Sequence, residues 1–161
     1  DLMGGEMTVS TTLGQGTLLE PGCWITLAPD ATIAVGDGCF LNRGVMLAAH
    51  DRIEIGDHVM FANNCFVGDA SHKFDDPDVP ITWQGFESKG PVSIGSNCWF
   101  GVNCVVTSGV TIGDRCVIGA NSVVTSDLPD GVIAAGSPAK VIREIKFHGA
   151  EAQGSGSQSQ E

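Results

Sequence analysis

Hydrophobic residues recur at every sixth position through the second half of the chain. The period is regular from residue 94 to residue 128, and a small residue, most often glycine, commonly follows the hydrophobic one. The six hydrophobic positions are Ile94, Phe100, Val106, Ile112, Ile118 and Val124. A six-residue period suits neither an amphipathic helix nor a long flat strand, but it suits a flattened coil whose short strands meet at corners. The pattern therefore predicts an all-β solenoid in which three hexapeptides close one triangular turn, and each turn buries its apolar face on its neighbours.

Less regular copies of the same period extend the predicted solenoid toward the N-terminus. The stretches 33–37, 53–57 and 92–96 resemble one another, so each is expected to open the equivalent face of successive coils. The hydrophobic positions of these earlier repeats are Leu19, Ile25, Val35, Leu41, Leu47, Ile55, Phe61 and Val67.

The array ends at a turn signal in residues 127–131. Residues 132–145 are predicted to form a last coil or short C-terminal cap, in which Ser137-Pro138 could start a short helix. The predicted division of the chain is a poorly specified lead-in at 1–16, a hexapeptide-repeat domain at 17–148 and a disordered, low-complexity tail at 149–161.

The period stops after Val67 and resumes only at Ile94, which predicts one long excursion loop. A long excursion from an otherwise compact repeat is more often functional than accidental. The plainer alternative, a disordered insertion, is disfavoured by Phe74, Trp83 and Phe86, which offer aromatic surface for docking.

All six cysteines fall in one slot of the repeat, the fifth position, counted from the hydrophobic residue. They are Cys23, Cys39, Cys65, Cys98, Cys104 and Cys116. The chain contains no CxxC spacing, which is the usual sign of a cysteine metal site. We therefore predict small buried hydrophobic residues rather than disulfides, metal ligands or redox groups.

Composition narrows the possible partners. Hydrophobic residues make up 42% of the chain, yet no apolar run approaches the ~20 residues that span a membrane and no signal-peptide pattern opens the chain. A soluble, cytoplasmic protein is therefore expected.

The net charge of −11 argues against a nucleic-acid partner, because proteins bind nucleic acid mainly through Lys and Arg. Lys140, Arg143 and Lys146 lie within seven residues, and this cluster suits an anionic cofactor.

One of the four histidines stands apart by its place. His72 lies at the mouth of the excursion, whereas His50, His58 and His148 lie elsewhere. A neutral imidazole at such a site can take the proton of an attacking hydroxyl, because its intrinsic pKa makes it a usable base near neutral pH.

The repeat array resembles the hexapeptide acyltransferases, and this resemblance implies a left-handed parallel β-helix. The handedness rests on the resemblance alone, because parallel crossovers are in general right-handed. A more specific similarity, over roughly residues 33–145, is to the sugar O-acetyltransferases that act on galactosides, maltose or exopolysaccharide. The motifs that carry it are Asp69-Ala70-Ser71-His72, Asp76-Pro77, Pro80-Ile81, Gln84-Gly85, Lys89-Gly90-Pro91, Asn97 to Gly101 and Gly136 to Ile142.

The resemblance implies acetyl transfer from acetyl-CoA to a hydroxyl of a saccharide-like acceptor. His72 would be the general base, the acceptor oxygen would attack the thioester directly, and backbone donors near Trp99 or Gly101 would stabilise the oxyanion. A homotrimer is implied, with each acetyl-CoA cleft between two subunits. The matched cofactor-binding positions are Trp99, Gly101, Val102, Ala120, Thr125, Lys140 and Arg143.

Acceptor binding is assigned to three residues. Asn42 matches an acceptor-binding asparagine, although a corner residue that satisfies backbone groups explains it equally well. Trp83 and Gln84 lie in the excursion, where the residues that select the acceptor are expected. An exopolysaccharide sugar, a glycoside, an amino sugar or an antibiotic all present suitable groups. The chain departs from the family pattern at Ser126, where relatives often carry lysine, and at Ser137.

Two other functions compete with acetyl transfer. A gamma-type carbonic anhydrase uses the same β-helix but needs three histidine zinc ligands. Here His50 and His58 lie on a different stretch from His72, so no metal is predicted. A non-catalytic assembly module is the other alternative, because β-helices also serve as scaffolds, and acetyl-CoA binding would discriminate between the two.

Overall fold

The computed structural model describes residues 10–148, which wind into a parallel β-solenoid with three faces. Sheet A contains β1 (Ser10–Leu13), β4 (Thr32–Val35), β7 (Arg52–Ile55), β12 (Val92–Ile94) and β15 (Thr111–Ile112). Sheet B contains β2 (Leu18–Leu19), β5 (Phe40–Leu41), β8 (Met60–Phe61), β13 (Trp99–Phe100), β16 (Val117–Ile118), β18 (Val132–Gly136) and β19 (Ala139–Glu144). Sheet C contains β3 (Trp24–Leu27), β6 (Met46–Ala49), β9 (Phe66–Gly68), β14 (Val105–Val106) and β17 (Val123–Val124).

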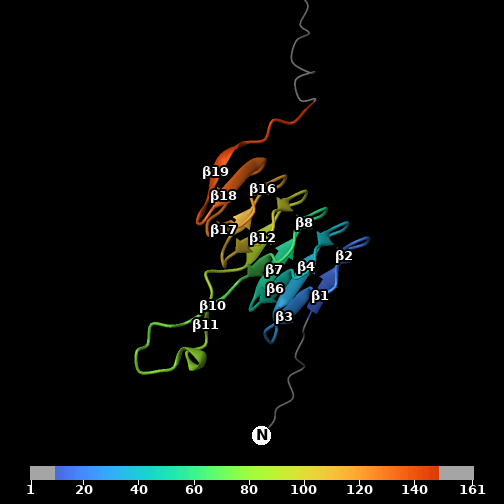
Figure 1. Cartoon of the computed structure of the whole chain (residues 1–161). Helices are drawn as coiled ribbons and strands as arrows, with labels where there is room; N and C mark the ends of the chain where they lie inside the picture. Colours follow the sequence, from blue (N-terminus) through green and yellow to red (C-terminus); the bar gives the residue numbers. More distant parts are fainter. Residues whose placement is uncertain (1–9, 149–161) are drawn as a thin grey trace, which may run out of the picture.

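Each coil contributes one strand to sheet A, then one to sheet B, then one to sheet C, and sheets A and C have five strands each. Figure 1 shows the successive coils stacked on one another, with the green excursion projecting from one side. The stacking is parallel and in register, as in the pairing of Ile55 with Ile94 and of Ile94 with Ile112. This architecture confirms the predicted fold class, a hexapeptide β-helix with one long excursion.

The hydrophobic positions of the repeat form the core. All six positions of the regular array are at most 2% exposed. Phe61 and Phe100, on successive strands of sheet B, stack with ring centroids 4.5 Å apart and planes 17° apart. One continuous column of side chains therefore stabilises the solenoid, and each coil depends on its neighbours for burial.

The corners explain the small residue at the second repeat position. At the corner between sheets A and B, the Asp57 carboxylate accepts a hydrogen bond from the Asp37 N–H at 2.8 Å, and the Asp114 carboxylate accepts one from the Ser96 N–H at 2.7 Å. A Cβ added at Gly36 would lie 2.3 Å from Asp57 Oδ1, so a side chain at Gly36 would break this ladder. At the corner between sheets B and C, asparagines with positive φ stack their side-chain amides, with Asn103 Nδ2 3.0 Å from Asn121 Oδ1.

Five of the six cysteines are buried and Cys23 is half-buried, which confirms their predicted interior position for five of them. Each Sγ lies 3.1 Å from the carbonyl oxygen of the second repeat position in the next coil, so the thiol is also a weak hydrogen-bond donor. Burial raises the pKa of Cys98 to about 12. The hydrogen bond shared by Cys65 and Cys104 raises the pKa of Cys65 and lowers that of Cys104, but these residues are only 1% and 0% exposed.

The C-terminal cap of the described chain is a β-hairpin. The turn between β18 and β19 contains Ser137-Pro138, and these two strands pair antiparallel as a hairpin at the end of sheet B. The predicted short helix is therefore wrong, because β18 alternates buried and half-buried residues with the period of a strand and pairs with β16. Strand β1 falls in the predicted lead-in and pairs with β4. The predicted tail, residues 149–161, lies outside the described residues.

Because a thiol must be exposed and ionised to react, we predict slow labelling of the native protein by a thiol reagent at the five buried cysteines and faster labelling at Cys23. Site-resolved mass spectrometry after timed quenching would measure the rates, with urea-unfolded protein as the reference in which all six react. Fast native labelling at most of the six would contradict the packing described here.

Candidate active site

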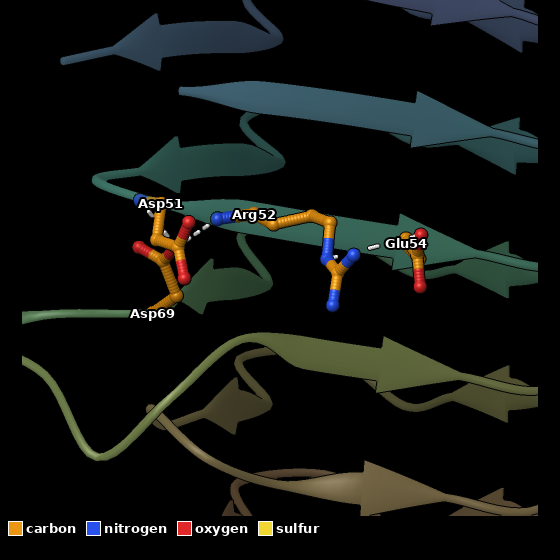
Figure 2. A network of polar contacts seen from close by, with 4 residues as sticks. All are labelled: Asp51, Arg52, Glu54 and Asp69. Carbon is orange, nitrogen blue, oxygen red and sulfur yellow. Dashed lines mark hydrogen bonds and ion pairs between the residues drawn. The ribbon is translucent and has the colours of Figure 1, made fainter. Parts of the chain in front are cut away.

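The excursion leaves sheet C at a buried carboxylate. Asp69, directly after β9, is 0% exposed. Its carboxylate accepts hydrogen bonds from the N–H groups of His50 at 2.6 Å, Asp51 at 2.8 Å and Arg52 at 2.6 Å. Figure 2 shows the bonds from Asp51 and Arg52. These three donors form the turn from β6 to β7 in the preceding coil, so the start of the excursion is fixed to the body of the solenoid.

A surface ion pair in the same network contributes little. Arg52 Nε lies 3.9 Å from Glu54 Oε1, and the two side chains are 51% and 53% exposed (Figure 2). Exposed pairs of this kind typically stabilise a protein by about 0–1 kcal/mol. The carboxylate of Asp69, and not this pair, therefore holds the turn.

The returning end of the excursion is attached to the same place. Ser88 Oγ donates a hydrogen bond to the carbonyl oxygen of Asp69, and the Gly90 N–H donates to Ser88 Oγ at 3.0 Å. The Lys89 N–H donates to Ser108 Oγ at 3.4 Å, and the Gly109 N–H donates to the Gly90 carbonyl at 2.8 Å. The outgoing end of the excursion at Asp69 and its returning end at Ser88 to Gly90, which we call its two roots, are thus attached to backbone or to buried groups.

His72 lies on a short antiparallel ribbon just beyond these roots. Strand β10 (Ser71–His72) pairs with β11 (Phe86–Glu87), and His72 is opposite Phe86. The exposed imidazole packs on the Phe86 ring with centroids 4.4 Å apart, and the other neighbour of that ring is His50 at 5.4 Å. The ribbon therefore presents a histidine to solvent while an aromatic ring restricts its motion.

A small cavity adjoins this aromatic group. Its volume is about 150 Å³, and small apolar side chains supply most of its wall. The lining residues are Thr26, Ala28, Ala48, Ala49, His50, Ala70 and Phe86.

The outer part of the excursion is organised by Gln84. Its Oε1 accepts a hydrogen bond from the Asp76 N–H at 3.1 Å, and its Nε2 donates to the carbonyl oxygens of Asp76 at 2.9 Å and Val79 at 2.6 Å. Trp83, at the end of the 3-10 helix η1 (Ile81–Trp83), is 78% exposed. Gln84 thus holds the loop together, and Trp83 offers an aromatic surface that its own chain leaves uncovered.

Most of the predicted cofactor positions lie along sheet B and the corner between sheets B and C. Trp99 is 51% exposed on the outer face of sheet B. At the corner, a Cβ added at Gly101 would lie 2.6 Å from the Ala120 backbone nitrogen, so the backbone approaches closely there. The N–H groups of Trp99 and Gly101, near which the oxyanion donors are expected, donate to the carbonyls of Cys116 at 2.9 Å and Ile118 at 2.8 Å.

Asn42 lies at the same corner, two coils before Gly101 and one before Ala62. Its Nδ2 donates to the Phe61 carbonyl at 2.9 Å, so one half of the side-chain amide satisfies backbone, as a corner residue would. Lys140 and Arg143 are exposed on β19, and Arg143 Nη1 donates to the Glu144 carbonyl at 3.0 Å.

The predicted site residues fall on two different edges of sheet C. His72 and Thr125 lie at the corner that joins sheet C to sheet A, because they follow β9 and β17. Gly101, Val102 and Ala120 lie at the corner that joins sheet B to sheet C. Sheet C separates these corners, so a single chain does not bring the predicted base together with most of the predicted cofactor positions.

Comparison with known proteins identifies the repeat. A family model described as the hexapeptide repeat of succinyl-transferase matches residues 91–126. A solved structure of a hexapeptide-repeat acetyltransferase from Vibrio cholerae O1 biovar eltor, complexed with acetyl coenzyme A, is 34% identical with a TM-score of 0.73, and the match covers 84% of this chain and 71% of that one. The chain belongs to the hexapeptide-repeat acetyltransferases.

Two curated relatives are longer than this member of the family. A probable acetyltransferase of Mycobacterium tuberculosis is 37% identical over 84% of this chain and 48% of its own length. The galactoside O-acetyltransferase of Escherichia coli K12 is 35% identical over 83% of this chain and 64% of its own length. The chain thus spans about half to two thirds of the length of these relatives.

Two further observations bear on the alternatives. Within residues 10–148, no three His, Cys, Asp or Glu side chains are grouped to hold one metal ion. In the same part of the chain, no helix has the length and apolar composition needed to cross a bilayer.

The sequence did not predict the hydrogen bonds of Asp69 and Ser88 or the contact of Phe86 with His72. The repeat register offered a signal for Asp69. Leu27 pairs with Ala49 in sheet C, and the pairing of Ala48 with Gly68 places Asp69 next in the same column. A carboxylate in this inward-facing column interrupts the apolar pattern set by Leu27 and Ala49. No local signal pointed to Ser88, because its partner Asp69 lies 19 residues away.

Proposed function

We propose that this chain transfers an acetyl group from acetyl-CoA to a hydroxyl of a saccharide-like acceptor. The observation that carries this proposal is the exposed imidazole of His72, held by the Phe86 ring and by the fixed roots of the excursion. Supporting it are the acetyl coenzyme A bound to the Vibrio cholerae relative and the galactoside O-acetyltransferase name of the Escherichia coli relative.

His72 acts as the general base in the proposed reaction. A ring nitrogen takes the proton of the acceptor hydroxyl while the oxygen attacks the thioester carbonyl. The tetrahedral intermediate collapses, the carbon–sulfur bond breaks, and the coenzyme leaves as a thiol after taking the proton. No covalent enzyme intermediate is needed in this reaction. Cys104, the cysteine whose pKa is lowered, is 0% exposed, so its thiol is not available to an acyl group as a nucleophile.

The oxyanion donor we propose is the N–H of Val102. The neighbouring N–H groups of Trp99 and Gly101 are already engaged in the ladder between coils. Within residues 10–148, the Val102 N–H has no hydrogen-bond partner, and Val102 is 41% exposed at the corner between sheets B and C. A free backbone donor at a fixed corner is the kind of group that stabilises developing negative charge.

The cationic end of sheet B would hold the nucleotide phosphates. Lys140 and Arg143 are both exposed on β19. They stand out in a chain with a net charge of −11, and exposed cations attract an anionic cofactor over distances of about a Debye length. Thr125 lies at the corner between sheets C and A, on the far side of sheet C from sheet B. A cofactor that contacts Thr125 as well as Lys140 and Arg143 would therefore contact two subunits.

A homotrimer with its clefts between subunits would unite the two edges. The outer face of sheet B carries a registered apolar column that includes Leu18, Met60 and Trp99, which are 62%, 45% and 51% exposed. Sheet A instead turns Glu54, Ser93 and Thr111 outward. Sheet C carries a similar outward column, from Trp24 through Met46 to Phe66, in which Trp24 is 66% exposed. Exposed apolar columns of this kind suggest that the faces carrying them pack against other subunits.

His72→Asn should lower the acetyl-CoA-dependent transfer rate by about 10²–10⁴-fold, because the amide cannot accept the hydroxyl proton at neutral pH. Acetyl-CoA affinity should change little. Free-thiol release with a panel of glycosides and amino sugars would measure the rate, and calorimetry would measure affinity.

The matched control is His58→Asn, which makes the same change at an exposed histidine on the corner between sheets A and B, where φ is 56° and asparagine is tolerated. It should keep the wild-type rate. A His72→Asn protein with more than half the wild-type rate would remove His72 from the mechanism. Absence of coenzyme A binding to the wild-type protein at about 1 mM, the upper end of ordinary KM values, would favour a non-catalytic assembly module.

Replacing both Lys140 and Arg143 with Ala should weaken coenzyme A binding by about tenfold or more, since charge-assisted contacts to phosphate are lost. The loss should be larger at about 0.01 M salt than at 0.1 M, because screening already weakens such contacts at the higher concentration. Arg52→Ala on sheet A, which also removes a positive charge, should leave affinity unchanged. Equal affinities for the double variant and the wild type would place the nucleotide elsewhere.

A further inference from the structure

The excursion packs poorly on its own chain. From Ser71 to Lys89 its side chains are exposed except for those of Val79 and Gln84, which are half-buried. Its large apolar residues Phe74, Ile81 and Trp83 are 68%, 54% and 78% exposed. Hydrophobic burial therefore contributes little to the placement of this loop within the chain, and polar contacts at its roots must supply most of it.

Asp69 provides the strongest of these contacts. Among residues 10–148 it is the only fully buried acidic side chain. Burying a carboxylate is costly unless hydrogen bonds compensate, and here three backbone N–H groups at 2.6–2.8 Å do so. The equivalent positions in the two preceding coils are Leu27 and Ala49, and those coils carry no excursion. The carboxylate thus occurs in this column only where the loop departs.

Ser88 attaches the returning end of the excursion to its outgoing end. Its hydroxyl donates to the carbonyl oxygen of Asp69, and it accepts from the Gly90 N–H, so the outgoing and returning strands are joined at one point. The ribbon of β10 and β11 starts directly above this junction, and His72 lies three residues after Asp69. A change in the direction of the Asp69 backbone would therefore move the ribbon that carries the imidazole.

From this arrangement we propose that Asp69 and Ser88 are positioning residues, which together form a clasp that directs His72 toward the acceptor. The inference rests on the proposed function of His72, and it adds two residues that act only through that histidine. Displacement of a reacting group by about 1 Å can cost on the order of 10²-fold in rate. The clasp is therefore expected to affect the catalytic step and not the binding of acetyl-CoA.

The test compares Asp69→Asn with Asp57→Asn. The first keeps the size of the side chain but replaces one acceptor oxygen by a donor facing backbone N–H groups. The second makes the same change at the corner between sheets A and B, where Asp57 accepts one hydrogen bond, from Asp37 at 2.8 Å. We expect Asp69→Asn to lower kcat by about 10–100-fold with KM for acetyl-CoA within about twofold of wild type, and Asp57→Asn to keep the wild-type kcat.

A double variant separates positioning from general loss of structure. If Asp69 acts through His72, adding Asp69→Asn to His72→Asn should produce no further loss of kcat. A similar further loss in both backgrounds would show a merely structural role and overturn the proposal, as would a wild-type kcat in Asp69→Asn. The proposed function itself is tested separately, because it fails if His72→Asn alone has no effect.

Hydrogen exchange gives a readout that does not depend on activity. Asp69→Asn should accelerate exchange of the Lys73 N–H, which donates to Gly85 across the ribbon at 3.1 Å, and leave the exchange of the core strands unchanged. Should Asp69→Asn fail to fold, Ser88→Ala is the milder variant and should lower kcat with the same insensitivity in the His72→Asn background. Unchanged ribbon exchange together with full activity in Ser88→Ala would overturn the clasp.

Discussion

In-register stacking of one coil on the next is the constraint on which the rest of this structure depends. Each strand finds its hydrogen-bond partners in the coils before and after it, so every residue column repeats the same environment. The cysteine thiols donate to the same carbonyl position in successive coils, and the corner aspartates accept the same N–H. An insertion is tolerated only where it leaves this ladder intact. The excursion satisfies that condition, because β12 pairs with β7 directly and the loop departs and returns at one corner.

The same constraint shapes the proposed active site. Residues in one column stay on one edge of the prism, so a base that leaves from the corner between sheets C and A lies across sheet C from the corner between sheets B and C of its own chain. Association of subunits is the simplest way to place His72 near Trp99 and Val102. The exposed apolar column on sheet B gives such an association a surface to bury. The buried Asp69 then has a clear place in this scheme, since a loop that reaches toward a second subunit needs a fixed origin on the first.

The sequence predicted the repeated core and the place of the excursion, and it missed the contacts between residues far apart in the chain. The six-residue period located the core from Ile94 to Val124, because each position makes the same contact in every coil. Local residue preference at Ser137-Pro138 favours a helix start, but the pairing of β18 with β16, which the local sequence does not reveal, decides the outcome. Asp69 and Ser88 lie 19 residues apart and meet only in the folded loop. The N–H groups of Trp99 and Gly101 could be assigned as engaged only once the strand ladder was known.

The most direct test of the account is complementation between two inactive variants. His72→Asn removes the base, and Ala120→Trp places a bulky side chain at the exposed corner between sheets B and C, where Gly101, Val102 and Ala120 are the proposed cofactor-binding positions. If each site takes its base from one subunit and its cofactor edge from another, mixed oligomers formed by co-refolding in equal amounts should regain about a quarter of the wild-type activity, since random cyclic association makes that fraction of clefts intact on both sides. Activity that never exceeds the sum of the two separate variants would contradict the shared site.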